Sequence, residues 1–104
     1  MATGQDFVEH VLGQAGLGAA LSPRKMFGEY GFYLDGKFVA IAADNMLFVK
    51  PTGAGRRLVP AMAEAPPYPG AKSWLLADEA LDDPDLLRRL LQATAAALPA
   101  AGKK

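Results

Sequence analysis

The stretch from Arg24 to Lys50 constrains the fold of this chain more than any other part. It contains four of the five phenylalanines and two of the three tyrosines, and an Asp35-Gly36 pair divides two runs rich in aromatic and β-branched residues. An Asp-Gly pair in this setting is typical of a two-residue type I′ hairpin, since both turn positions take positive φ. Asp44-Asn45 indicates a second, weaker turn of the same kind. The sequence therefore predicts a three-stranded antiparallel β-meander over residues 24–50.

The hairpin at Asp35-Gly36 would place Leu34 opposite Lys37 and Tyr33 opposite Phe38. Because side chains alternate along a strand, an uninterrupted register sorts the meander into two faces. The first face has Tyr30, Phe32, Val39, Ile41 and Phe48. The second has Gly31, Tyr33, Phe38, Ala40, Ala42, Leu47 and Val49.

Neither of these faces is polar, whereas an antiparallel sheet with one solvated face alternates apolar and polar residues. At roughly 25 cal/mol per Å², leaving several large apolar side chains in water costs several kcal/mol, which is comparable to the stability of a small domain. We therefore expect both faces to be covered, by helices, by a second subunit or by a ligand. The second apolar face is the reason to expect a homodimer.

Helices are predicted before and after the meander. Thr3 with Asp6 resembles a capping box, an apolar stripe at helical spacing follows, and Gly18 is expected to end this N-terminal helix. After the meander, Thr52 is expected to cap a short middle helix, although its Gly53-Ala54-Gly55 start favours a flexible linker.

The last part of the chain predicts a further strand and a C-terminal helix. Residues 71–77 include Trp74, to which we assign core packing, and they favour a strand. Asp83 is expected as N-cap, with Pro84 at the first helical position. The chain is thus expected to be one α+β domain over residues 1–104, with a disordered tail at about 100–104.

Composition argues against several classes of function. There is no cysteine, one histidine (His10) and no net charge. Nucleophilic catalysis needs an activated nucleophile with a base in reach, so we expect no enzyme. The acidic residues lie mostly in predicted turns and at a helix start, so we expect no metal site, and we expect no cofactor. The lack of cysteine and of a signal-like or membrane-spanning run favours the cytoplasm and argues against a membrane location.

Direct nucleic-acid binding is the alternative to a protein-contact function. Most of the cations lie in the middle of the chain, and Arg24 and Lys25 are expected just before the first strand, with Lys50 at the end of the third. Cations along one sheet edge would suit a phosphate backbone. The residues expected on an interaction surface are Arg24, Lys25, Phe27, Tyr33, Phe38, Lys50, Arg56 and Arg57.

Four short motifs carry a resemblance to a known family. They are Met26-Phe27-Gly28, Tyr30-Gly31, Tyr33-Leu34-Asp35-Gly36 and Leu47-Phe48-Val49-Lys50. Together with a proline-aromatic segment at residues 65–68, they resemble the TfoX (Sxy) N-terminal domain family over nearly the whole chain. The sequence departs from the family pattern at Glu29, where glycine is common, and at Ala77, where proline is common.

The resemblance implies an α+β domain related to the secretion-chaperone-like arrangement. In γ-proteobacterial competence regulators such a domain precedes a helical C-terminal domain and works with a cyclic-AMP-dependent transcription activator. No TfoX C-terminal domain is expected in this chain. The shared residues shape the fold and name no active site. We therefore expect a non-enzymatic regulatory or adaptor module that contacts a protein partner, such as a transcription regulator, with a link to transcription or competence.

Overall fold

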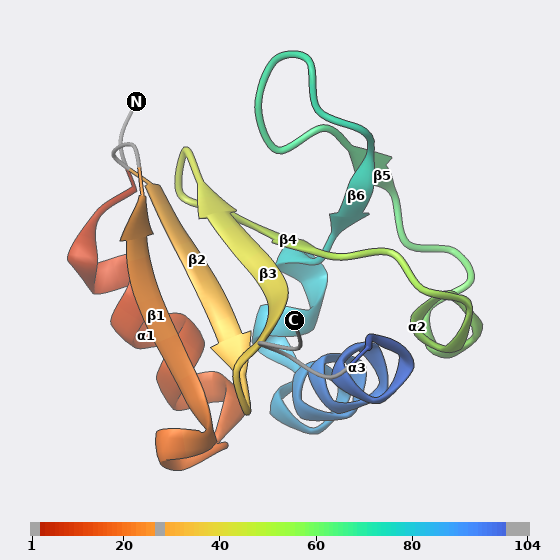
Figure 1. Cartoon of the computed structure of the whole chain (residues 1–104), viewed down its shortest axis with the longest axis horizontal. Coiled ribbons are helices and arrows are strands. Elements are labelled where there is room, and N and C mark those ends of the chain that lie inside the picture. The colour runs from red at the N-terminus through yellow and green to blue at the C-terminus, as the bar shows by residue number, and fades with distance from the viewer. Residues whose placement is uncertain (1–2, 27–28, 100–104) are drawn as a thin grey trace.

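A six-stranded antiparallel sheet with helices against one of its faces forms the body of the chain (Figure 1). The computed structural model describes residues 3–26 and 29–99. Along the chain the elements are α1 (Gln5–Ala15), a 3-10 turn (Gly18–Ala20), β1 (Leu21–Met26), β2 (Glu29–Leu34), β3 (Lys37–Ala43), β4 (Met46–Val49), α2 (Gly53–Leu58), β5 (Glu64–Ala65), β6 (Trp74–Leu76), a 3-10 turn (Asp78–Asp82) and α3 (Pro84–Ala97). The order of strands across the sheet is β1-β2-β3-β4-β6-β5. The predicted α+β class, with N-terminal, middle and C-terminal helices, is confirmed.

Both predicted hairpin turns are present. Asp35 and Gly36 have φ angles of 52° and 83°, and Asp44 and Asn45 have 55° and 58°. Two consecutive positive φ values define the type I′ turn, which matches the twist of the strands on either side. The turn between β2 and β3 also fixes the predicted pairs Leu34–Lys37 and Tyr33–Phe38.

A β-bulge in β3 overturns the predicted sorting of side chains. After the Tyr33–Phe38 pair the register shifts, so that Phe32 lies opposite Ala40 and Gly31 opposite Ile41, with Val39 as the extra residue. An extra residue moves the rest of its strand to the other face. Ile41 and its β4 neighbour Phe48 therefore share a face with Tyr33 and Phe38, whereas Ala40, Ala42, Leu47 and Val49 lie on the face of Phe32.

The meander has one more strand than the sequence predicts. We expected Arg24 and Lys25 to precede the first strand, but both lie inside β1, which pairs with β2 along its whole length. Pro23 is compatible with this strand because β1 is at the edge of the sheet, where fewer backbone donors are needed. The further strand is shorter than the predicted 71–77, and β5, which was not predicted, extends the sheet beyond it.

The start of α1 differs from the expected capping box. Gly4 is the N-cap, and no side-chain hydrogen bond caps the helix there. The helix ends at Ala15, and Gly16 (φ 62°), in the left-handed region, takes the capping position expected for Gly18. The hydroxyl of Thr3 is used elsewhere, because it donates to the carboxylate of Glu29 at 2.6 Å, with the backbone oxygen of Ala42 also within 3.1 Å.

The caps of the other two helices are as predicted. The Thr52 hydroxyl accepts a hydrogen bond from the Gly55 amide at 2.9 Å, so the segment expected to be a flexible linker is the first turn of α2. The Asp83 carboxylate accepts from the Leu86 amide at 3.2 Å, and Pro84 begins α3. Among the described residues, no helix is long and apolar enough to cross a membrane.

Helices α1 and α3 cover one face of the sheet, which we call the inner face (Figure 1). The largest fully buried side chains of the core beneath them are Phe32, Leu47, Leu75, Leu87, Leu90 and Leu91. The expectation that helices cover an apolar face is thus met on the inner side. The proposed tail at about 100–104 lies outside the described residues.

Candidate functional site

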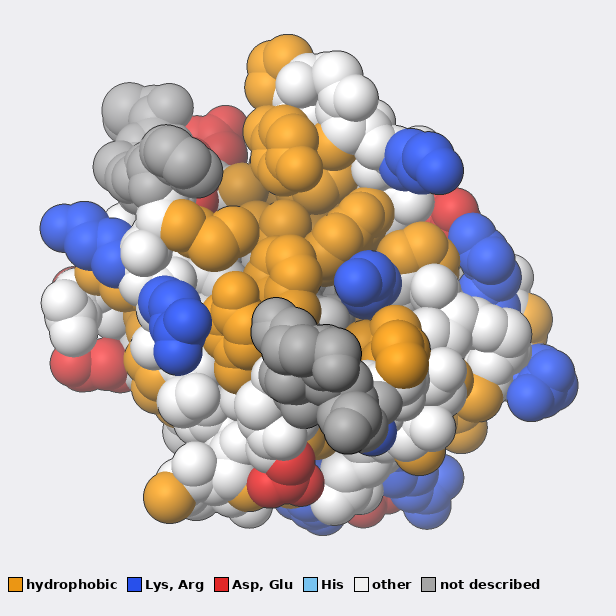
Figure 2. All heavy atoms as spheres, viewed as in Figure 1, with side chains coloured by type: hydrophobic (Ala, Val, Ile, Leu, Met, Phe, Trp, Pro, Cys, Tyr) orange, Lys and Arg blue, Asp and Glu red, His pale blue; other side chains and the backbone are white. Residues whose placement is uncertain are grey.

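The opposite face of the sheet, which we call the outer face, has no described helix over it and is nevertheless apolar. Figure 2 shows hydrophobic side chains in a broad band across this face, with Lys and Arg side chains beside it. Its centre, Ile41, Ala43 and Phe48, is 2–3% exposed because neighbouring side chains of the same face pack around it. The half-buried side chains of this outer layer are Met26, Tyr33, Phe38, Met46, Ala65, Trp74 and Leu76.

Three aromatic rings from different strands lie in contact across the outer face. Tyr33 and Phe38 stack with ring centroids 5.1 Å apart, and Phe38 meets Trp74 edge-on at 5.6 Å. Such pairs contribute about 0.5–1.5 kcal/mol beyond the area they bury. We call Tyr33, Phe38 and Trp74 the aromatic row. It connects the paired strands β2 and β3 to β6, which pairs with neither of them.

Gly31 provides the space over which the aromatic row lies. A Cβ atom at this position would be 2.9 Å from Cε1 of Phe38 and 3.2 Å from Sδ of Met26. Both distances are shorter than ordinary van der Waals contact, so the Phe38 ring and the Met26 side chain rest directly on the glycine backbone. A side chain here would lift them from the sheet.

Two cations lie against the aromatic row, Arg24 in β1 and Lys50 directly after β4. The Arg24 guanidinium is 4.9 Å from the Tyr33 ring centroid, and Lys50 Nζ is 5.7 Å from the Phe38 ring centroid. At exposed sites a cation–π contact contributes about 0.5–1 kcal/mol. Neither cation forms an ion pair with another residue of the described part of the chain. Their charges are therefore directed to the outer face and are not neutralised there.

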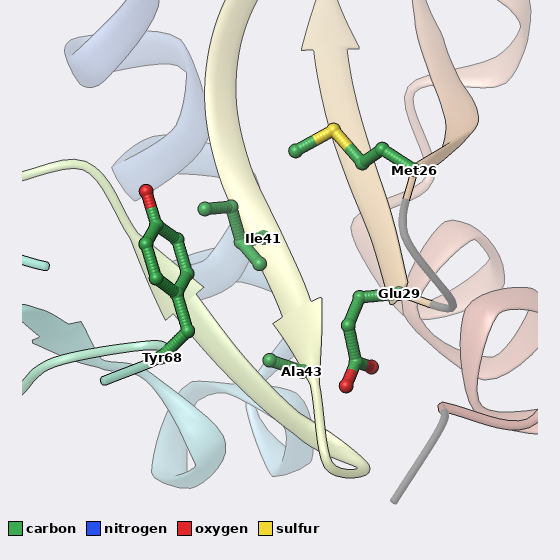
Figure 3. Close-up of a pocket in the computed structure, with 5 residues that line it drawn as sticks. All are labelled: Met26, Glu29, Ile41, Ala43 and Tyr68. Carbon is green, nitrogen blue, oxygen red and sulfur yellow. The ribbon is translucent and has the colours of Figure 1, made fainter. Parts of the chain in front are cut away.

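A hollow of about 460 Å³ opens on the outer face beside the β3–β4 turn. Ile41 and Ala43 of β3 form its floor, Met26 and Glu29 stand on one side, and Tyr68 from the loop between β5 and β6 faces them (Figure 3). The Tyr68 residue is 56% exposed. The hollow is large enough for one bulky side chain of a partner.

Glu29 anchors the end of the sheet that borders this hollow. Its Oε1 accepts hydrogen bonds from the Thr3 amide at 3.0 Å, the Thr3 hydroxyl at 2.6 Å and the Asp44 amide at 3.2 Å. The Asn45 Oδ1 accepts a further hydrogen bond from the Gly4 amide at 3.0 Å. Glu29, where the resembled family commonly has glycine, therefore holds the chain before α1 against the β3–β4 turn. This carboxylate has a structural role.

The structure brings four of the eight predicted surface residues together. Arg24, Tyr33, Phe38 and Lys50 form one contact group on the outer face. Lys25 is next to Arg24 in β1 and lies opposite Tyr30, a residue of the inner core, so its side chain is on the other side of the sheet. Phe27 lies outside the described residues.

The two arginines of α2 are separate from this group. The Arg56 guanidinium pairs with the Glu64 carboxylate through bonds of 3.0 and 3.3 Å. This hydrogen-bonded pairing lowers the pKa of Glu64 and raises the pKa of Arg56. Arg56 and Arg57 are exposed at the end of α2.

Sequence reasoning missed several members of the outer face. Ile41 and Phe48 were assigned to the other face because the bulge at Val39 has no glycine or other marker in the sequence. Trp74 does pack against a buried apolar cluster as predicted, but this cluster belongs to the outer face, where Trp74 is half-buried and closes the aromatic row. The alternation of Trp74 and Leu76 indicated that these two share a face, but not which face it is.

The chemistry of the described residues matches a contact surface. His10 lies exposed on α1, far in sequence from the aromatic row. Residues 3–26 and 29–99 hold no group of three or more His, Cys, Asp or Glu side chains arranged for a metal ion. The outer face carries an aromatic row, a hollow beside the β3–β4 turn and two cations that have no ion-pair partner among the described residues.

Comparison with known proteins identifies the class to which this α+β domain belongs. The family model described as the TfoX N-terminal domain matches residues 14–98. The chain belongs to this family, and the resemblance drawn from the sequence motifs is confirmed. It is also similar to an uncharacterized 12.7 kDa protein in the trpE 5′ region of Spirochaeta aurantia. The two are 41% identical over 100 residues, which cover 96% of this chain and 87% of that protein.

Proposed function

We propose that the chain is a non-enzymatic regulatory or adaptor module of the cytoplasm that acts through protein–protein contacts made by its outer face. The observation that carries this proposal is the contrast between the two sides of the sheet. Helices cover the inner face, while the outer face presents an apolar layer, a hollow and two cations to the solvent. Exposed apolar patches of this kind mark contact sites in soluble proteins.

The regulatory side of the proposal rests on family membership. The family resemblance links such domains to transcription and competence regulators, and a transcription regulator is the kind of partner that we propose. A homodimer is an alternative form of this contact, since a second copy of the chain would also cover an apolar face. Static light scattering at micromolar concentration tests that form of it, and a monomer at all concentrations would exclude it.

Site-specific photo-crosslinking tests where the contact is made. A photo-reactive amino acid at Tyr68, which is exposed beside the hollow, should form adducts with protein in a lysate of the native host. The same amino acid at Gln92, which is exposed on α3, serves as the matched control. Adducts at Gln92 but not at Tyr68 would show that the contact is on the helical side and would contradict the proposal.

A further inference from the structure

The pattern of charge on the outer face points to the chemistry of the partner. Arg24 and Lys50 both lie against the aromatic row, and neither has a carboxylate partner among the described residues. The described acidic side chain on this face is Glu29, which stands at the end of the sheet and accepts three hydrogen bonds. The middle of the face is therefore apolar and positive.

We infer that the outer face binds an acidic protein segment that places a bulky apolar side chain in the hollow and carboxylates on Arg24 and Lys50. This inference rests on the proposed function and names the class of partner for the same surface. The hollow accounts for the apolar side chain, since its floor is Ile41 and Ala43 and its far wall is Tyr68. The two cations account for the carboxylates by complementary charge.

A second copy of the chain fits the same surface less well. Two outer faces brought together would each supply Arg24 and Lys50, and each would offer Glu29, which is already held by Thr3 and the Asp44 amide. Like charges brought together at an interface are costly. An acidic segment instead neutralises both cations when it binds.

A single-stranded nucleic acid also carries negative charge, but its bases need open ring faces. Such strands bind by stacking bases on aromatic side chains. Here Tyr33 already stacks on Phe38 and has Arg24 over its ring, and Phe38 has Lys50 over its ring. A base would have to displace a cation from each ring, whereas a carboxylate can bind the same cations without moving them.

Selection from a random peptide library displayed on phage tests the inference without a known partner. The full chain is the bait, and the enriched peptides should combine Asp or Glu with a bulky apolar residue. Enrichment of basic peptides, of uncharged apolar peptides, or of none would overturn the inference. A single-stranded thymidine oligonucleotide is measured in parallel, and tighter binding of this probe would show that the occupant is nucleic acid.

Two double variants that each remove two positive charges, at different places, test where the peptide binds. The affinity of a selected peptide is measured by fluorescence anisotropy for R24A/K50A and for K25A/R57A, which removes two cations that lie away from the aromatic row. Each exposed ion pair changes affinity by a factor of about two to five, so R24A/K50A should weaken binding about 4- to 25-fold. The control should change it less than about twofold. Equal losses in the two variants would overturn the inference.

A third variant separates this inference from the proposed function. Tyr68→Ser removes one wall of the hollow at an exposed position and should weaken the acidic peptide without unfolding the chain. If uncharged peptides are selected and depend on Tyr68, contact through the outer face holds and the acidic partner is wrong. If Tyr68 crosslinks to nothing in the lysate and Gln92 does, the proposed function fails as well.

Discussion

Replacing Gly31 by alanine should destabilise the fold by lifting the Phe38 ring from the sheet. The added Cβ would stand 2.9 Å from Phe38 Cε1, and ordinary contact begins at 3.4 Å. The ring must therefore withdraw by about 0.5 Å or more, against a steep repulsive wall. The φ angle of Gly31 is not in the positive range, so the backbone itself can accept alanine.

The size of the effect follows from two opposing contributions. Over-packing a tight site costs about 1–3 kcal/mol. Replacing a glycine within a strand by alanine stabilises the fold by about 0.5–1 kcal/mol, because the unfolded chain then has less backbone freedom. With central values of about 2 kcal/mol for over-packing and about 0.75 kcal/mol for the glycine, the net loss is about 1.3 kcal/mol. For a chain of this size such a loss lowers Tm by about 5–10 °C.

The assay is urea and thermal unfolding followed by circular dichroism and by the fluorescence of Trp74, which touches Phe38. Gly13→Ala is the matched control, because Gly13 is exposed in α1 with nothing within 4 Å of the added Cβ. This change should stabilise the helix by about 0.5–1 kcal/mol. The two glycines should thus respond to the same substitution with opposite sign.

A double-mutant cycle identifies Phe38 as the cause. In a Phe38→Leu background the ring atom at 2.9 Å is gone, so most of the cost of Gly31→Ala should disappear. If Gly31→Ala costs nothing in the natural sequence, or costs the same in both backgrounds, the close packing of the aromatic row over Gly31 is wrong.

Two other predictions concern the polar contacts of the fold. Glu29→Ala should lower the free energy of unfolding in urea by about 1–3 kcal/mol, because the Thr3 amide and hydroxyl and the Asp44 amide lose their acceptor. Glu29→Gln keeps an acceptor oxygen and should lower it less. Equal losses in the two variants would count against the hydrogen-bonding role. The pairing with Arg56 lowers the pKa of Glu64 relative to its value in the unfolded chain. The pair therefore contributes to folding stability above the unfolded pKa, and this contribution is lost as the pH falls through the folded pKa. Carbon-detected NMR titration should show the lowered pKa of Glu64 returning to the ordinary range in Arg56→Ala, and an unchanged value in that variant would rule out the pair as its cause.

The turns and caps of this chain were predictable because each is a local interaction with a local sequence signal. Asp35-Gly36 and Asp44-Asn45 form the expected turns, and Thr52 and Asp83 cap the expected helices. In each case the residue that signals the feature also makes the bond or adopts the φ angle. Distant parts of the chain are not needed to decide the outcome.

The bulge was not predictable, because nothing at Val39 distinguishes it from an ordinary strand residue. A β-branched residue suits both an uninterrupted ladder and the observed shift, and the choice depends on packing beneath the sheet. The bulge puts both Val39 and Ala40 into the inner core and turns Ile41 outward. One inserted residue therefore decided which apolar side chains belong to the candidate surface.

The edge strand β1 was missed for a similar reason. Ser22-Pro23 is a strong signal against helix, and the same pair is compatible with an edge strand once β2 is present as a template. As a result Arg24 was placed before the sheet, although the structure places it over Tyr33. Lys25 was grouped with Arg24 from sequence proximity, but alternation along β1 separates them.

Oxidative footprinting tests the central claim, that a protein partner covers the outer face, most directly. Hydroxyl radicals react readily with the sulfur and aromatic side chains that this face presents, and Met26, Tyr68 and Trp74 report on it, while Leu58 on α2 reports on another exposed position. The purified chain should be oxidised at all four residues. In its native cellular context, Met26, Tyr68 and Trp74 should become protected while Leu58 stays reactive. Unchanged oxidation of these three residues, or protection confined to Leu58, would contradict the account.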